Sequence, residues 1–176
     1  RLGRAGVAGV LPRQRFDWIV CDSPAGIEKG AQLAMRFADV AVVVTNPEVS
    51  SVRDSDRIIG MLDSKTMRAE TGDRLEKHLL LTRYDAARAA RGEMMKVEDI
   101  LEILAIPLLG IVSESPDVLT ASNVGSPVTL HNPTSAAARA YTDAARRLMG
   151  ETIEINTPAE RRGFMSRLFG RKAAVA

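Results

Sequence analysis

An apolar run that ends in an acidic residue and a proline–glycine turn constrains this chain more than any other stretch: FDWIVCDSPAG, residues 16–26. The run Phe16–Val20 predicts a strand buried on both faces, as in a parallel sheet. Asp22 follows at the carboxyl end of that strand, where open α/β sheets place ligands. Pro24 and Gly26 predict a turn that can bring backbone N–H groups close to a phosphate. The residues leave a second role open, in which Asp22 only caps the next helix.

Apolar runs alternate with amphipathic segments along the rest of the chain. We expect strands over residues 39–45, 78–82 and 108–112, and helices over 27–37, 51–64, 97–104, 116–123 and 134–149. The polar segments 64–77 and 86–96 are expected to be exposed connections. Strands that alternate with helices form βαβ units with right-handed crossovers, so the pattern predicts an α/β fold with a mainly parallel sheet.

The helix expected over residues 51–64 carries two acidic residues, Asp54 and Asp56, outside its apolar side. Ser51 and Asp54 have the spacing of a capping box, so we expect the helix to begin at Ser51. The apolar residues of this helix share one side. Asp54 and Asp56 lie on its flanks, where solvent or a partner can reach them.

Length and composition exclude several kinds of site. The 176 residues suffice for one domain with a sizeable core, expected over residues 1–150. The single cysteine, Cys21, excludes an internal disulfide and a Cys-rich zinc site, and its place in the apolar run predicts a buried thiol. Trp18 in the same run is expected in the core. His78 and His131 have no ligand-type neighbours at metal-binding spacing, so we expect no metal site around them.

The charge is distributed unevenly along the chain. The net charge of +2 combines a mildly acidic body with five cations that follow Glu160, namely Arg161, Arg162, Arg167, Arg171 and Lys172. The basic residues Arg13, Arg15, Arg88 and Arg91 are expected to be solvated and show no interleaving with aromatic residues that would suggest nucleic acid, so we expect no nucleic-acid partner. There is no apolar run of transmembrane length and no signal peptide, which predicts a cytosolic origin.

The last residues predict a membrane-binding tail. Residues 151–160 are polar and read as a linker, and RRGFMSRLFGRK at 161–172 follows. On a helical wheel its large apolar residues fall within one arc of about 140°: Phe164, Met165, Leu168 and Phe169. Cations beside such an arc are typical of an interfacial membrane helix, although a terminal helix docked on the core is the alternative. So short a helix is marginal in water, and we expect it to order on lipid.

Six stretches spread over nearly the whole chain carry a family resemblance: FDWIVCDSPAGIEKGA, TNPEVSSVRDSDRIIG, HLLLTRYD, VEDILEIL, ASNVGSPV and RRGFMSRLFGRK. They resemble the ParA/MinD family of deviant Walker A ATPases, and the tail favours its division-site branch. The resemblance implies a P-loop NTPase-like fold and a homodimer formed around ATP and Mg²⁺. It also implies a protein of the cytoplasm and the inner face of the cell membrane. Its implied partners are the septum inhibitor MinC, which it recruits, and MinE, which stimulates hydrolysis.

The resemblance also implies roles for single residues. Asp22 matches the catalytic acid associated with Mg²⁺ through water, and Pro24 and Gly26 match the rest of that nucleotide-binding loop. Thr82 and Arg83 match the segment beside the adenine. Asp54 and Asp56 match exposed acids on the helix that partners bind. The membrane-binding residues are Arg161, Arg162, Phe164, Met165, Arg167, Leu168 and Phe169.

Two departures from the family pattern limit what the chain is expected to do. The printed sequence has no KGGVGKT-like phosphate loop, so we expect a C-terminal portion of such an ATPase that does not hydrolyse ATP by itself. Ser113 stands where the family usually has a proline before Glu114, near the base. Two alternatives stay open: another ParA/MinD-type ATPase, for flagellar number or plasmid partition, or a non-enzymatic module tethered to the membrane.

Overall fold

A three-stranded parallel sheet forms the centre of the molecule. The computed structural model describes residues 16–23 and 29–157, and its strands are β1 (Val40–Thr45), β2 (Glu76–Tyr84) and β3 (Leu108–Ser113), in the order β1-β2-β3. β1 pairs with β2 from Val40–Glu76 to Thr45–Leu81, and β2 pairs with β3 through two register shifts. The parallel α/β architecture predicted from the alternating pattern is confirmed.

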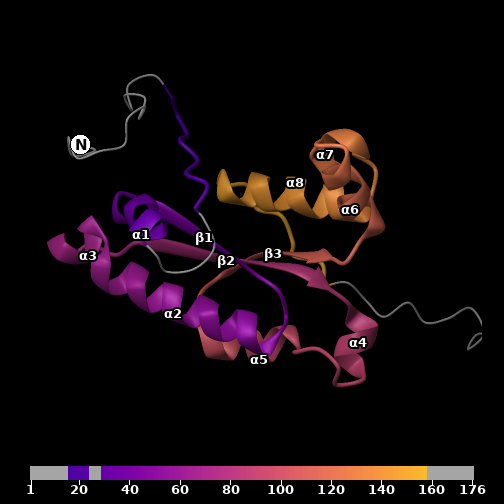
Figure 1. Ribbon diagram of the computed structural model, residues 1–176, viewed down its shortest axis with the longest axis horizontal. Coiled ribbons are helices and arrows are strands. Elements are labelled where there is room, and N and C mark those ends of the chain that lie inside the picture. The colour runs from indigo at the N-terminus through magenta and orange to yellow at the C-terminus, as the bar shows by residue number, and fades with distance from the viewer. Residues whose placement is uncertain (1–15, 24–28, 158–176) are drawn as a thin grey trace, which may run out of the picture.

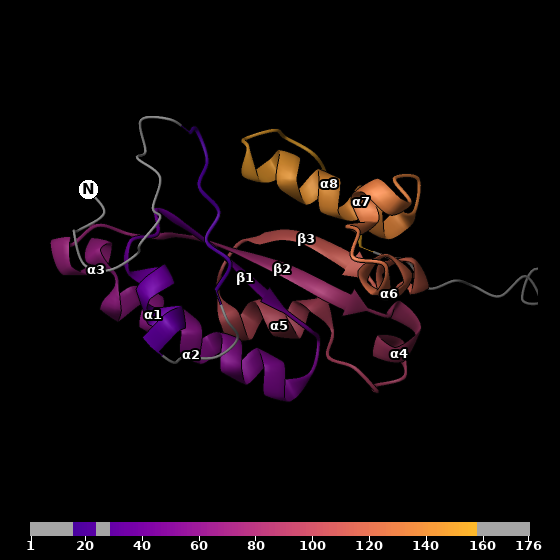
Figure 2. The ribbon, with the colours of Figure 1, turned by 45° about the horizontal axis from the view of Figure 1, so that its top comes forward.

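Helices cover both faces of this sheet (Figures 1 and 2). They are α1 (Lys29–Arg36), α2 (Val49–Lys65), α3 (Met67–Thr71), α4 (Ala86–Ala90), α5 (Val97–Leu104), α6 (Pro116–Asn123), α7 (Val128–His131) and α8 (Ala136–Leu148). Figure 2 shows α2 and α5 below the sheet and α8 above it. Among the described residues, no helix is both long enough and apolar enough to cross a bilayer.

Side chains of β2 alternate between the two faces of the sheet and contribute to the hydrophobic core on each face. Leu79 and Leu81 point to one face and are fully buried in a cluster with residues of α2 and α5, including Ile100. Leu80 points to the other face and packs with residues of β3 and α8, including Ala144. Successive side chains of a strand point to opposite faces, so a continuous apolar run is required where both faces are covered.

The helix expected to begin at Ser51 begins two residues earlier, and the capping-box prediction is wrong. Glu48 is the N-cap and makes no side-chain cap bond. The Val52 N–H donates to the Glu48 carbonyl (2.9 Å). Ser51 therefore already lies within the first turn of the helix and is not its N-cap. The Ser55 hydroxyl donates to the Ser51 carbonyl (2.8 Å). The chain leaving β1 turns at Asn46–Glu48, and the helix starts directly after that turn.

Two segments expected to be connections contain short helices, so those predictions are wrong. α3 lies within 64–77 and is capped by Thr66, whose hydroxyl accepts from the Ala69 N–H (3.2 Å). α4 lies within 86–96 and is capped by Asp85, whose carboxylate accepts from two backbone N–H groups at its start. A further short helix, α7, ends at His131. Side-chain caps form such helices locally, without the apolar periodicity on which the sequence prediction relied.

The opening strand expected at Phe16–Val20 is not formed, and this prediction is wrong. Residues 16–23 carry no strand, and Figure 1 shows them leaving the sheet. Trp18 is 53% exposed and Val20 89% exposed, and Cys21 is exposed rather than buried. A strand needs a neighbour to pair its backbone and to cover its side chains. No described strand pairs with this segment.

Candidate functional site

The carboxyl ends of the three strands bring polar side chains together. The Thr82 hydroxyl, near the end of β2, lies 3.0 Å from Asn46 Oδ1 and 3.3 Å from the Thr45 carbonyl, both of which can accept its proton. Asn46 directly follows β1, and Thr45 is buried beneath it. The edge predicted to place ligands is therefore the edge where these residues meet. Sequence analysis missed Asn46, although a polar residue directly after a buried strand was the available signal.

Arg83 adopts an uncommon backbone conformation at the same edge. Its φ is +56°, in the left-handed region that few non-glycine residues occupy. Its guanidinium donates to Glu114 Oε1 (3.2 Å), and both side chains are well exposed. Backbone strain of this kind persists where surrounding contacts hold it, and it concentrates at functional sites. The contact therefore presents Arg83 beside Thr82, at the edge where the resemblance places the base.

Ser113 does not prevent this arrangement. It is the last residue of β3 and pairs with Tyr84 in the ladder. The next residue, Glu114, donates its N–H to the Tyr84 carbonyl (3.0 Å). This backbone bond brings the Glu114 carboxylate to Arg83. With serine at position 113, Glu114 therefore still lies at this edge of the sheet.

The described residues at this edge carry polar groups of three kinds. Thr82, Asn46 and Glu114 supply hydroxyl, amide and carboxylate groups at one edge. Magnesium prefers oxygen ligands such as carboxylates, yet the part of the chain that the structure describes holds no group of three His, Cys, Asp or Glu side chains placed for a metal. Asp22 is exposed on the segment that leaves the sheet, and Pro24 and Gly26 lie outside the described residues.

The two acids assigned to partner binding are on the outer side of α2. The inner side buries Val52, Ile59 and Leu62. Asp54 and Asp56 are both exposed, and the Asp54 carboxylate forms an exposed ion pair with Arg57 (3.5 Å). Such pairs contribute little to stability, so Asp54 can exchange this partner for another cation at low cost.

The membrane-binding residues predicted in the tail lie outside the described residues: Arg161, Arg162, Phe164, Met165, Arg167, Leu168 and Phe169.

Comparison with known proteins identifies the class. No model of a known protein family matches the chain. The structure of an Aquifex aeolicus MinC:MinD cell division complex matches with a TM-score of 0.72 and 42% identity, over 83% of this chain and 57% of that chain. MinD of Pyrococcus horikoshii, solved with Mg-ADP, matches with a TM-score of 0.60 and 26% identity, over 73% of this chain and 49% of that chain. The fold is therefore that of the ParA/MinD class of α/β ATPases.

Curated relatives narrow the class. The septum site-determining proteins MinD of Neisseria meningitidis and of Escherichia coli K12 are each 53% identical to this chain over 96% of its length. The chain is thus similar to MinD proteins along nearly its whole length, and the resemblance drawn from its six stretches is confirmed. It spans 64% of the length of these two relatives.

Proposed function

We propose that this chain is part of a MinD-type ATPase that selects the bacterial cell-division site. In this proposal the protein dimerises around ATP, binds the inner face of the cell membrane, recruits MinC and hydrolyses ATP in response to MinE. The observation that carries the proposal is the 53% identity to MinD proteins along nearly the whole chain. The exposed acids of α2 and the polar edge at Thr82 and Arg83 support it.

The helix α2 is proposed as the partner-binding surface. The A. aeolicus relative was solved with MinC, and the outer side of α2 offers Asp54 and Asp56 without involving the core. Complementary charges across an interface steer partners and set specificity.

Replacing Asp54 and Asp56 together with asparagine is expected to weaken binding of MinC at least about tenfold, since two interfacial charges are removed. Binding is measured by titrating the full chain with purified MinC. Asp63→Asn, which neutralises an exposed acid farther along the same helix that pairs with Lys77, is the control and should bind MinC as the parent does. If the double variant bound MinC with unchanged affinity, Asp54 and Asp56 of α2 would not belong to the interface.

The tail is proposed as a weak, reversible membrane anchor. Full burial of its four large apolar side chains would contribute roughly 6–10 kcal/mol. Interfacial burial is partial, and ordering about ten residues costs a comparable amount. Cations near anionic lipid add about 1 kcal/mol each. Two tails on one dimer bind more strongly through effective concentration, so dimerisation would act as a membrane switch.

A second candidate function rests on two observations: the printed sequence has no phosphate loop, and the described residues show no metal-binding cluster. The 176 residues would then bind membrane and partner without turnover. Phosphate release from MgATP by this chain is expected to stay at background. Release above background that Asp22→Ala abolishes would contradict this candidate and would support Asp22 as the catalytic acid, with Pro24, Gly26, Thr82 and Arg83 around the nucleotide.

A further inference from the structure

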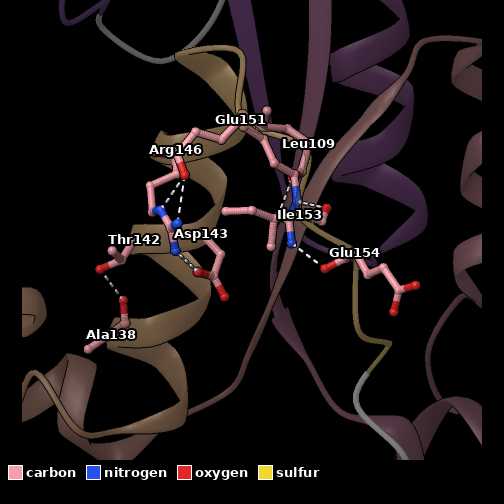
Figure 3. A network of polar contacts seen from close by, with 9 residues as sticks. Leu109, Ala138, Thr142, Asp143, Arg146, Glu151, Ile153 and Glu154 are labelled. Atoms are coloured by element: carbon pink, nitrogen blue, oxygen red, sulfur yellow. Dashed lines mark hydrogen bonds and ion pairs between the residues drawn. The ribbon is translucent and has the colours of Figure 1, made fainter.

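One arginine of α8 binds three backbone carbonyl groups from two separate parts of the chain. Figure 3 labels the three residues that supply these carbonyls, Leu109, Ile153 and Glu154. Arg147 Nη1 donates to the Leu109 carbonyl of β3 (2.8 Å). Its Nε donates to the Ile153 carbonyl (2.8 Å), and its Nη2 donates to the Glu154 carbonyl (2.7 Å). The planar guanidinium presents its donors in a fixed fork, so all three bonds can form at once. Arg147 therefore joins the segment after α8 to the sheet.

This segment crosses from one face of the sheet to the other. α8 packs on the face of Leu80, and the chain turns after it at Gly150, whose φ is +94°. Ile153 is half-buried, and Ile155 packs against the cluster of α2 and α5 on the opposite face. Residues 151–157 contain no helix or strand, yet their course is set by Arg147 and by these two isoleucines.

A glycine in β3 makes room for this contact. A Cβ built on Gly110 would lie 3.3 Å from Ala144 Cβ and 3.4 Å from Arg147 Nη1. The absence of a side chain lets α8 approach β3 closely enough for the guanidinium to reach the Leu109 carbonyl. The contact between Arg147 and Leu109 thus depends on both β3 and α8.

We infer that Arg147 clamps residues 151–157 to the domain, so that only three residues, 158–160, separate the clamped segment from the predicted membrane helix. The lipid half of this inference depends on the proposed function. Three residues span at most about 10 Å, so the clamp holds the domain close to a bound lipid surface. Arg147 is a positioning residue in this scheme and touches no lipid.

The neighbouring arginine provides a matched control. Arg146 donates to the Glu151 carboxylate from Nε (2.9 Å) and Nη2 (2.6 Å), and this hydrogen-bonded pair holds the pKa of Glu151 below its usual range. Its contacts are to exposed side chains, whereas Arg147 binds main-chain carbonyls of the segment and the strand. Loss of Arg146 should therefore leave the course of residues 151–157 unchanged.

Spin-label distances in the full chain test the clamp. In a Cys21→Ser background, one label at position 157 and one at position 98 of α5 report the course of the segment. The parent is expected to show a narrow distance distribution, which Arg146→Met should retain. In Arg147→Met the seven released residues would have an r.m.s. span of about 15 Å, and the distribution should broaden accordingly.

A second label pair separates this role from general unfolding. Positions 53 of α2 and 98 of α5 are both exposed, and their distance should not change in Arg147→Met. If that variant fails to fold, Arg147→Lys replaces it, because an ammonium group cannot present the fork that reaches three carbonyls. Two outcomes would overturn the clamp. One is a distance distribution between labels 157 and 98 that stays unchanged in the Arg147 variants, and the other is a distribution that is already broad in the parent.

Energy transfer to vesicles tests the lipid half separately. A donor at position 98 and an acceptor in anionic vesicles should show efficient transfer in the parent and Arg146→Met, and reduced transfer in Arg147→Met. Equal transfer in all three bound variants would show that the clamp does not hold the domain close to lipid. Absence of binding by the parent would contradict the membrane function, and the spin-label result would still decide the clamp.

Discussion

Replacing Phe164 with glutamate is expected to abolish binding of the chain to anionic vesicles, with a loss of more than about tenfold in affinity. One phenylalanine contributes about 2 kcal/mol on burial, and a carboxylate placed in the apolar arc adds a further penalty. The net free energy with which the tail binds lipid is small, because the cost of ordering its backbone opposes most of the gain from burial. Co-sedimentation of the full chain with vesicles over a range of lipid concentrations measures the effect.

Ser166→Glu is the matched control for this substitution. Ser166 falls on the other side of the helical wheel, so the variant adds the same charge without removing an apolar anchor. The expected loss is about 1 kcal/mol, or about fivefold, from electrostatics. Sedimentation of Phe164→Glu equal to that of the parent would contradict an interfacial helix. Equal losses in both variants would mean that charge, rather than apolar burial, holds the tail to lipid.

Leu79→Ala is expected to lower the free energy of unfolding by about 3 kcal/mol, because it leaves a cavity in a closely packed core. Leu79 has no exposed surface, and it lies in the central strand, where it packs in the cluster between the sheet and helices α2 and α5. Since a domain of this size is stable by only about 5–15 kcal/mol, this loss is a large part of the total. Urea unfolding followed by circular dichroism measures it.

Leu130→Ala makes the same chemical change on the surface. Leu130 is 76% exposed in α7, so its removal should alter stability by less than about 0.5 kcal/mol. If the two variants were equally stable, the central position of Leu79 in the sheet would be wrong.

The sequence predicted the elements whose signal is local. The helices at Val97–Leu104 and Pro116–Asn123 have the predicted bounds. β1 and β3 differ from prediction by one residue at an end, and β2 extends two residues beyond the prediction at each end. Each of these elements carries its own apolar period, which a single stretch of chain displays completely. The placement of Thr82 and Arg83 at the carboxyl edge follows from the same pattern.

The sequence did not predict contacts that join distant residues. Nothing near Thr82 in the chain indicates that it bonds Asn46, and nothing near Arg147 indicates that it reaches Leu109. The cap residues of α3 and α4 were visible, but short capped helices show no periodicity. These features depend on which segments the fold places side by side.

What the sequence by itself determined is the resemblance to MinD proteins, the parallel α/β pattern and the identity of the acids on α2, since each is written in contiguous residues. The tertiary structure decided whether an apolar run becomes a strand. The runs at β1 and at Phe16–Val20 look alike, yet only β1 pairs with a described neighbour. Tertiary contacts also decided where residues 151–157 lie. Pairing and packing partners come from remote parts of a chain, so no local pattern contains them.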